Sequence, residues 1–365
     1  MAPRRARAIV QEAPERLVLR ELPVPEIDAD SALLRVEACG ICGSDVEQFT
    51  GVLPVPMPVV PGHEPLGVIE RIGERAAARW GVAEGDRVAV EPLIPCGYCR
   101  TCIEGRYQAC RGRGGMFAHG YVPLAHPPGL WGGYAEYMFL DGHSIVHPIR
   151  KDLPASVAVM FNPLGAGFRW AVEIPRTRPG ETVLVLGPGQ RGLASVIAAR
   201  AAGAGTIIVT GLARDAPKLA LARAFGADHV IDVEAENARV RVKEITGGRG
   251  ADVVVEVSSY ATAPVAEALH YVASGGRIVL AGVKGFKPVP DFVSDLIVVK
   301  EAVVLGAFGV TTRAYDAAIR LIESETLPLA RLHTHDFALA DAEEAIRTLA
   351  GERPGAPSIH SCLVP

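Results

Sequence analysis

Seven cysteines are the residues of this sequence that most directly suggest chemistry, because their spacing is that of metal ligands. Four of them, Cys96, Cys99, Cys102 and Cys110, fall within fifteen residues. Gaps of two residues let neighbouring thiolates reach one ion, and four thiolates complete a closed tetrahedral zinc site. We expect a structural zinc there, because a closed site leaves no coordination position for a substrate. Reduced thiols or an iron–sulfur cluster are the alternatives, but iron–sulfur sequences use other spacings or a following proline.

A second candidate metal site combines the segment Cys42-Gly43-Ser44-Asp45 with Gly62-His63-Glu64. A thiolate, an imidazole and a carboxylate could hold zinc in an open site, where water or substrate takes the remaining position. Each of these residues alone is more often structural than a ligand. Cys39 and Cys42 could instead form a redox pair, but such pairs belong to βαβ units and this one lies in β-rich sequence.

A glycine-rich turn is the third chemical signal. It consists of Gly187, Pro188, Gly189, Gln190, Arg191 and Gly192. It directly follows the apolar run 182–186 and opens an alanine-rich helix. This order of strand, turn and helix is typical of dinucleotide sites, where the glycines let a pyrophosphate approach the helix N-terminus. An ordinary glycine-rich turn is the alternative.

The strand after this turn leaves the choice of dinucleotide open. In NAD sites that strand ends in an acid that binds the ribose 2′-hydroxyl, and here Gly211 stands at that place. Arg214, or Arg191 within the turn, could meet the 2′-phosphate of NADP. Asp215 could instead reach the ribose of NAD. The loop charges could also be merely solvated, so NAD and NADP are both kept as cofactors.

The elements that must position these residues divide the chain into two regions. Residues 1–155 contain short β-branched runs separated by Gly and Pro, which is typical of antiparallel β structure. From residue 156 onward, apolar strands alternate with helices, which predicts a doubly wound parallel sheet and an α/β fold. Strands are expected over 182–186, 207–210, 229–231, 253–257 and 277–280. A helix is expected over 154–174, interrupted by Pro163.

The composition fits an enzyme of about two domains. At roughly 150 residues per domain, 365 residues with 49% hydrophobic content suit two cores. The net charge of −4 is small, and the basic residues are scattered rather than arranged in a nucleic-acid-binding stripe. The arginines near the start are not followed by an apolar signal region, and no apolar run of about 18 residues exists. We therefore expect a cytoplasmic protein without nucleic-acid or membrane partners.

Together the motifs resemble those of the zinc-dependent medium-chain alcohol and polyol dehydrogenases, with the threonine and sorbitol dehydrogenase-like branches nearest. The resemblance covers nearly the whole chain. It rests on segments 40–45, 61–64, 85–88, 96–110, 132–137, 163–164, 187–192 and 225–228. It implies a GroES-like β-rich catalytic domain formed by 1–155 and 300–365, and a Rossmann domain formed by 156–299. It also implies two zinc ions per subunit and a homodimer or homotetramer.

The resemblance assigns roles to four residues of the second candidate metal site. Cys42 and His63 match the protein ligands of a catalytic zinc. Glu64 matches a carboxylate that ligates that zinc or lies beside it. Ser44 matches the hydroxyl that passes the substrate proton onward.

Two departures from the family pattern concern the same site. The third ligand of the family is usually Cys, Asp or Glu, and here Asn162 stands at that position. A neutral amide would hold the metal less firmly, so Glu64 could compensate by direct coordination, or the catalytic zinc could be lost. Where many relatives complete a proton relay with His, this chain has Glu47, which could pass a proton to solvent or be only a surface charge.

The predicted function is that of an NAD(P)-dependent oxidoreductase that converts a small-molecule alcohol, preferably a secondary one, to a ketone or aldehyde. A carbonyl or enone reductase of the same fold without catalytic zinc is one alternative, and a non-catalytic nucleotide-binding protein is another. The aromatic-rich segment 114–131 could shape the pocket, form a subunit contact or simply pack at the surface. We expect His333 and His335 to be structural or solvated, and Cys362 to be a thiol without a ligand role.

Overall fold

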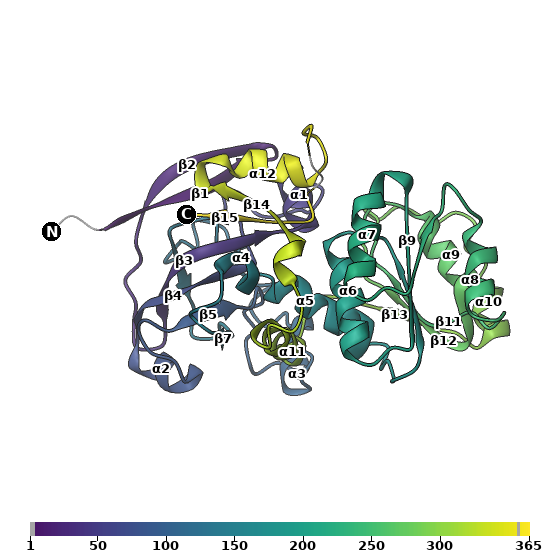
Figure 1. Cartoon of the computed structure of the whole chain (residues 1–365). Helices are drawn as coiled ribbons and strands as arrows, with labels where there is room; N and C mark the ends of the chain where they lie inside the picture. Colours follow the sequence, from purple (N-terminus) through teal and green to yellow (C-terminus); the bar gives the residue numbers. More distant parts are fainter. Residues whose placement is uncertain (1–3, 356–357) are drawn as a thin grey trace. The chain divides into compact units, whose positions relative to one another are not determined.

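Two β-sheets organise the chain, one in each of the two units into which its contacts divide. The computed structural model describes residues 4–355 and 358–365, whose course Figure 1 shows. One unit comprises Met1–Asn162 with Ile319–Pro365, and the other comprises Pro163–Ala318. The expected β-rich and parallel-sheet regions are both present, whereas the domain limits at 155/156 and 299/300 stay a prediction.

The second unit is a doubly wound parallel sheet. Its strands are β8 (Thr182–Leu186), β9 (Thr206–Gly211), β10 (His229–Asp232), β11 (Ala251–Glu256), β12 (Val272–Leu280) and β13 (Val303–Gly306). They lie in the order β10-β9-β8-β11-β12-β13, with all neighbours parallel. The chain reverses its winding direction at β8, so the carboxyl ends of β8 and β11 flank a switch point, where ligands bind in such folds.

Helices cover both faces of this sheet (Figure 1). They are α6 (Gln190–Ala201), α7 (Ala216–Ala224), α8 (Ala238–Ile245), α9 (Ala263–Tyr271) and α10 (Asp295–Lys300). Because both faces are covered, the inner strands are mostly apolar, and all five residues of β8 are buried. This continuous apolar run made β8 predictable from the sequence.

The first unit is built on a seven-stranded sheet and a hairpin of β1 (Arg5–Ala13) with β2 (Arg16–Pro23). The sheet contains β3 (Ala32–Ile41), β4 (Pro65–Ile72), β5 (Arg87–Val90), β6 (Tyr137–Leu140), β7 (Val146–Pro148), β14 (His333–Ala338) and β15 (His360–Val364). Their order is β14-β15-β3-β4-β5-β7, and β6 also pairs with β3. Only β14 and β15 are parallel to each other. β15 follows the whole second unit in sequence, yet it lies between β14 and β3.

The helices of this unit are short. They are α1 (Gly43–Phe49), α2 (Glu74–Trp80), α3 (Arg100–Ile103), α4 (Ala155–Ala158) and α12 (Ala342–Leu349). α5 (Phe161–Phe168) and α11 (Thr312–Glu323) run across the limits between the units. Among the described residues, none of the helices has the length and apolar character that crossing a bilayer requires.

The expected helix over 154–174 is divided differently from the prediction. α4 ends before α5 begins at Phe161, and a π-helical turn, Arg169–Glu173, follows α5. Pro163 therefore lies in the first turn of α5. A proline costs no helical hydrogen bond there, because the first N–H groups of a helix have no intrahelical acceptor. The prediction that Pro163 interrupts the helix is wrong.

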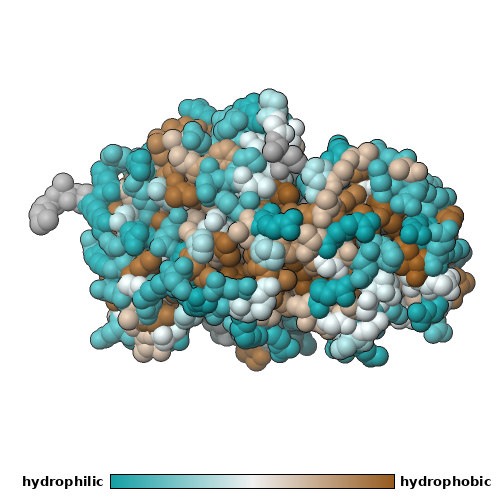
Figure 2. Space-filling model, viewed as in Figure 1, coloured by the Kyte–Doolittle hydropathy of each residue, from teal (hydrophilic) through white to brown (hydrophobic). Residues whose placement is uncertain are grey.

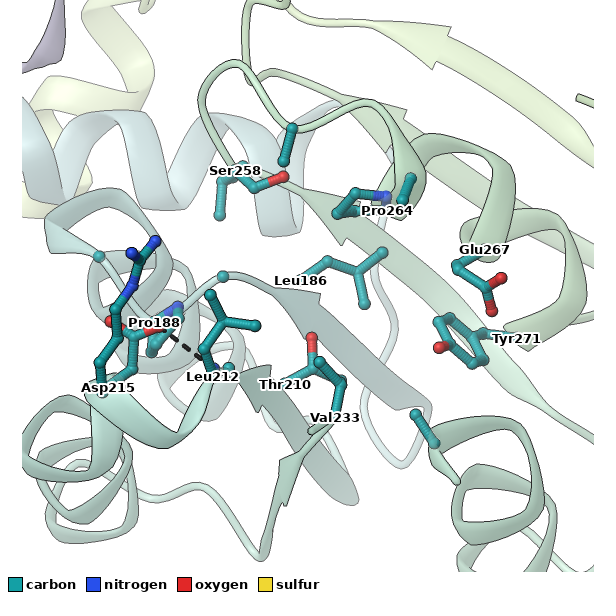
Figure 3. Close-up of a pocket in the computed structure, with 18 of the residues that line it drawn as sticks. Leu186, Pro188, Thr210, Leu212, Asp215, Val233, Ser258, Pro264, Glu267 and Tyr271 are labelled. Atoms are coloured by element: carbon teal, nitrogen blue, oxygen red, sulfur yellow. Dashed lines mark hydrogen bonds between the residues drawn. The ribbon is translucent and has the colours of Figure 1, made fainter. Parts of the chain in front are cut away.

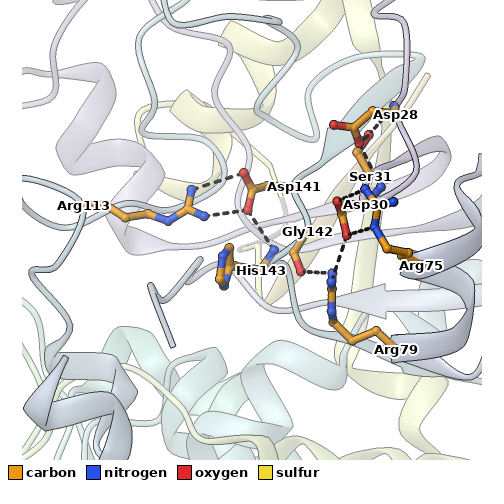
Figure 4. A network of polar contacts seen from close by, with 9 residues as sticks. All are labelled: Asp28, Asp30, Ser31, Arg75, Arg79, Arg113, Asp141, Gly142 and His143. Atoms are coloured by element: carbon orange, nitrogen blue, oxygen red, sulfur yellow. Dashed lines mark hydrogen bonds and ion pairs between the residues drawn. The ribbon is translucent and has the colours of Figure 1, made fainter. Parts of the chain in front are cut away.

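A polar network anchors the segment that follows the four clustered cysteines (Figure 4). Arg113 pairs with both carboxylate oxygens of Asp141 at 2.8 and 3.2 Å. The next residue, Gly142, accepts a hydrogen bond of 2.7 Å from Arg79, which also binds Asp30 at 3.0 Å. Side chains from α2 and from two loops thus tie this segment to the sheet.

Candidate active site

The four cysteines of segment 96–110 converge on one point. The Sγ–Sγ distances are 3.5 Å for Cys99 and Cys102, 3.8 Å for Cys99 and Cys110, and 3.9 Å for Cys96 and Cys102. Thiolates placed tetrahedrally around zinc, with bonds of about 2.3 Å, are roughly 3.8 Å apart. The backbone N–H of Cys96 also donates to Cys110 Sγ at 3.3 Å. The donors therefore fit the closed zinc site that the spacing predicts.

The start of α1 positions Cys42 and Ser44. Cys42 is the N-cap residue of α1, and its backbone N–H donates to Oδ2 of Asp45 at 2.8 Å. This contact is half of a capping box, in which the third helical residue binds back to the N-cap. Ser44 Oγ consequently lies 2.9 Å from Cys42 Sγ. The local fold thus presents a thiol and a hydroxyl side by side.

His63, two residues before β4, completes the group. Its Nε2 lies 3.3 Å from Cys42 Sγ and 3.2 Å from Ser44 Oγ. Its Nδ1 faces the other way, 3.4 Å from Asp45 Oδ1 and 3.4 Å from the Tyr121 hydroxyl. Zinc-binding histidines typically hold the second nitrogen against a carboxylate in this manner. Nε2 is therefore the nitrogen available to a metal ion.

The donor distances of this group fit zinc. At a tetrahedral angle, a sulfur and a nitrogen bound to one zinc ion would be about 3.6 Å apart, close to the 3.3 Å between Cys42 and His63. Cys42, Asp45 and His63 are all buried, and their ligand atoms lie within 4.8 Å of one another. The carboxylate in this group is Asp45 and not the expected Glu64.

The remaining predicted residues of this site have defined places in the fold. Glu64 is fully buried, and its carboxylate uses the space beside Gly40, where a Cβ would lie 2.4 Å from Oε2. Asn162 is buried in the first turn of α5. Glu47 lies on α1, three residues after Ser44, and is partly buried. Their roles as ligands or proton carriers stay predictions.

The sequence analysis includes Asp45 in the motif and Tyr121 in a segment that could shape the pocket, but it predicts no contact of either residue with His63. Asp45 had a local signal, because the spacing Cys42-x-x-Asp45 is that of a capping box. Tyr121 had none, because it comes from segment 114–131 and reaches His63 only in the folded chain. Elsewhere the aromatic residues of that segment form core: Trp131 is 2% exposed and packs against Phe117 and Phe139.

The surroundings shift the pKa values of three groups at these sites. Burial alone would lower the pKa of His63, but interactions with Tyr121, Asp45 and Cys42 outweigh burial and hold this pKa well above its ordinary value. Burial raises the pKa of Tyr121 to about 12, so its hydroxyl stays protonated and can donate. In the cysteine cluster, a hydrogen bond from Thr101 is the main cause that lowers the pKa of Cys99 to about 5.

A cavity of about 790 Å³ opens in the second unit where the carboxyl ends of its strands meet (Figure 3). Its lining includes Gly187, Pro188, Gly189, Thr210, Gly211, Arg214 and Ser258. Gly187 has a φ of 105°, which turns the chain from β8 into α6. Gly192 is needed for packing, because a Cβ there would lie 1.9 Å from the Gly187 carbonyl oxygen.

The turn after β9 brings one cation, Arg214, and one carboxylate, Asp215, to the lining of the cavity. Arg214 lines the cavity and is exposed. Its side chain has no ion-pair partner in the described part of the chain. Asp215 is already engaged, because it accepts the backbone N–H of Leu212 at 3.2 Å (Figure 3) and lies 3.5 Å from Lys218. Arg191, at the start of α6, places its guanidinium over the ring of Trp170.

Comparison with known proteins shows the same two regions. Residues 28–151 match the alcohol dehydrogenase GroES-like domain, and residues 192–324 match the zinc-binding dehydrogenase domain. The Mycobacterium tuberculosis protein named "Probable alcohol dehydrogenase adh" is 49% identical over 361 residues, which cover 98% of each chain. The chain belongs to the zinc-type medium-chain alcohol dehydrogenase family.

Two further members show the breadth of this dehydrogenase family. The erythritol/L-threitol dehydrogenase of Mycolicibacterium smegmatis is 33% identical and covers 100% of this chain and 98% of its own. A Sinorhizobium meliloti 1021 protein solved with NADP bound is 28% identical, with a TM-score of 0.86 over 99% of this chain and 100% of that one. The predicted resemblance, the GroES-like and Rossmann fold class and the prediction of an oxidoreductase acting on alcohols are confirmed.

Proposed function

We propose that this dehydrogenase oxidises a secondary alcohol or polyol to a ketone, with NADP as hydride acceptor and a zinc ion held by Cys42 and His63. The observation that carries the proposal is the convergence of Cys42 Sγ, Ser44 Oγ and His63 Nε2, which lie no more than 3.3 Å apart. Thiolate, imidazole and hydroxyl are the groups that an open zinc site and its proton carrier require.

A zinc ion and a nicotinamide dinucleotide would supply the reactive chemistry, and side chains of this chain would hold them. When present, zinc lowers the pKa of an alcohol oxygen and the nicotinamide takes up a hydride. Cys42 and His63 would hold the zinc, with Asn162 or Glu64 completing the ligand set. Two zinc ions per subunit are proposed, the other bound by the four cysteines of segment 96–110.

Among the side chains around the candidate zinc site, some would move the substrate proton and others would orient the zinc ligands. Ser44 Oγ, which contacts Cys42 Sγ and His63 Nε2, would accept the proton that the alcohol releases. Glu47, one helical turn further along α1, would carry that proton to solvent. Asp45, whose Oδ1 lies 3.4 Å from His63 Nδ1, would favour the proton on that nitrogen and leave Nε2 to the metal ion.

The cavity of the second unit supports NADP as the preferred dinucleotide. Gly187, Pro188 and Gly189 line it at the start of α6, with Gln190, Arg191 and Gly192 following, where the pyrophosphate is proposed to bind. Gly211 replaces the acid that would bind a ribose 2′-hydroxyl. Arg214 would pair with a 2′-phosphate. The NADP bound to the Sinorhizobium relative supports the same assignment.

We also propose a homodimer or homotetramer. β13 is the edge strand of its sheet, and Val303 on it is 47% exposed. The neighbouring α10 exposes Val298 at 76% and Val299 at 72%, and apolar residues interrupt the polar surface over this helix (Figure 2). Apolar surface at a sheet edge is typical of subunit interfaces. Cytoplasmic action is proposed because zinc-binding thiols need a reducing compartment.

Initial rates with NADP and NAD, measured on a panel of secondary alcohols and polyols, test the proposed reaction. Ser44→Ala should lower kcat by a factor of about 10² to 10⁴, as expected for a lost proton carrier. Cys42→Ser should lower both zinc content and turnover. Cys39→Ala, which removes a buried thiol without a proposed ligand role, is the matched control and should retain both. Turnover that survives Cys42→Ser and His63→Gln would instead indicate a reductase without catalytic zinc.

A further inference from the structure

A third group of metal-binding side chains lies on β14 and β15, outside the two sites described above. Its members are His333 and Asp336 on β14 and Cys362 on β15, whose ligand atoms lie within 4.8 Å of one another. His333 Nε2 is 3.0 Å from Asp336 Oδ1. Cys362 Sγ is 3.0 Å from the same oxygen. An imidazole, a carboxylate and a thiol thus meet at one point.

A shift in strand register brings His333 and Asp336 together. Residues three apart on a regular strand point to opposite faces. His333 is paired with His360, but the next pair is His335 with Ser361, so β14 contains one additional residue at this place. Asp336 is thereby paired with Cys362, and its Oδ1 lies 3.0 Å from His333 Nε2. Bulges commonly re-aim side chains beside functional sites.

The group has a buried inner side and an open outer side. Cys362 is 1% exposed, and the His333 side chain is 13% exposed, whereas that of Asp336 is 59% exposed. An ion could enter past Asp336, and water could complete its coordination. The three side chains would therefore partly enclose a metal ion and still leave it accessible from solvent.

A second histidine orients the imidazole of the group. Nδ1 of His333 lies 2.9 Å from Nδ1 of His360, which is 1% exposed. This contact directs Nε2 of His333 toward Asp336 and Cys362. Hydrogen bonding of the non-coordinating nitrogen is the usual arrangement around a metal-binding histidine. His333 Nε2 lies 3.0 Å from Asp336 Oδ1 but forms no well-aligned hydrogen bond with any described residue.

We propose that His333 Nε2, Asp336 Oδ1 and Cys362 Sγ bind a borderline transition-metal ion, with Zn²⁺ as the preferred one. These three donor types are those that zinc prefers. Binding replaces the proton of the Cys362 thiol, which leaves to solvent. Because the ligands come from two neighbouring strands, the ion fastens β14 to β15. This proposal replaces the expectation that His333 is structural and that Cys362 has no ligand role.

Metal counting on matched variants tests the third site. The full chain is freed of metal, reconstituted with Zn²⁺, separated from unbound ion and analysed for zinc per chain. We expect one ion fewer in Cys362→Ser and in His333→Gln than in the unmodified protein. His335→Gln, which changes a histidine two positions away on the same strand, is the control and should bind the full number.

Cobalt provides a readout that does not depend on counting. Co²⁺ is added to protein in which the other two metal sites already hold zinc. Binding of Co²⁺ at the third site should produce a thiolate-to-cobalt charge-transfer absorption band, and the Cys362→Ser variant should lack this band. Asp336→Asn changes an exposed side chain, so it keeps the test possible if a buried variant does not fold. Unchanged zinc content and an unchanged cobalt band in the variants would overturn the proposal. Alcohol oxidation should persist in all of them, so the outcome is independent of the proposed reaction.

Discussion

Oδ1 of Asp45 lies 3.4 Å from Nδ1 of His63, while Oδ2 of the same carboxylate accepts the backbone N–H of Cys42 at 2.8 Å. One buried side chain therefore orients two residues that are expected to bind the same zinc ion. The carboxylate sets the direction of the His63 ring and the start of the helix after Cys42. Its contribution to metal binding should consequently be visible even without direct coordination.

Replacing Asp45 should weaken zinc binding at the Cys42–His63 site. Asp45→Asn removes the charge that holds the Nδ1 proton, and loss of such a partner typically lowers metal affinity by about 10- to 100-fold. Competition with a chelator measures the zinc affinity of the variant. Asp30→Asn, which changes a surface carboxylate bound to arginines, is the control. Equal zinc retention in the two variants would contradict the role assigned to Asp45.

The cluster of four cysteines should hold its own zinc ion. Cys102→Ser should release one zinc per chain and lower the melting temperature by roughly 5 °C or more, because structural zinc contributes to folding free energy. Elemental analysis and thermal unfolding measure the two effects. Tyr98→Phe is a control within the same segment, since Tyr98 is 68% exposed. A full zinc content in Cys102→Ser would argue against a four-thiolate site.

Arg214 should determine the preference between the two dinucleotides. A hydrogen-bonded charge pair with a phosphate is worth about 1.5–3 kcal/mol, so Arg214→Ser should raise the KM for NADP by roughly 10- to 100-fold. The KM for NAD should change little. Arg223→Ser on α7 alters a similar charge outside the cavity lining and serves as the control. A loss that is equal for NADP and NAD would exclude contact with the 2′-phosphate.

A buried ion pair at the end of β11 should be needed for stability. Glu256 is fully buried, and Lys284 Nζ lies 2.8 Å from its Oε2. Lys284→Met leaves the carboxylate without its cation, so the free energy of unfolding should fall by about 3–5 kcal/mol. Adding Glu256→Gln removes the stranded charge and should recover part of this loss. Urea unfolding of the single and double variants measures the interaction energy between Glu256 and Lys284. If the losses of the two single variants simply add in the double variant, the two side chains do not interact and the prediction is contradicted.

His119 should make the stability depend on pH. Burial lowers its pKa to about 4, and its two nitrogens contact the Trp131 carbonyl oxygen and the Ser144 hydroxyl. As the pH falls below about 6.5, the unfolded chain takes up a proton that the folded chain refuses. The free energy of unfolding should therefore decrease by roughly 2 kcal/mol between pH 7 and pH 5 through this group alone.

Comparison with His119→Gln isolates that contribution. Glutamine keeps hydrogen-bonding groups near the same positions but does not titrate. The difference in unfolding free energy between the protein and this variant should shrink as the pH is lowered over that range. A difference that stays constant with pH would show that His119 takes up a proton equally in the folded and unfolded chains, and would contradict the lowered pKa.

The sequence predicts best what is encoded over a few neighbouring residues. The strand expected over 182–186 has those same bounds in the structure, because an apolar run limited by turns is sufficient to define a buried parallel strand. The glycines after it are needed for a turn and for close packing within the same segment. The convergence of the cysteine cluster follows from spacing alone.

The sequence predicts poorly what depends on distant segments. Tyr121 reaches His63 across 58 positions, and no local pattern marks that contact. The register shift that joins His333 to Asp336 depends on the pairing of β14 with β15, which periodicity within β14 cannot reveal. The prediction for Pro163 is wrong because the effect of a proline depends on where the helix begins, and the surroundings set the ends of helices as much as propensity does.

The placement of β15 has a consequence for synthesis on the ribosome. Cys362 on β15 is aligned with Gly40 on β3, so the two strands are made more than three hundred residues apart. The parallel sheet between them is formed from a continuous stretch of chain, and it can fold while β3 still has an open edge. Because unpaired strand edges invite association with other chains, the nascent polypeptide carries such an edge at residues 39–41 of β3 until β15 emerges, whereas β6 already covers residues 32–35.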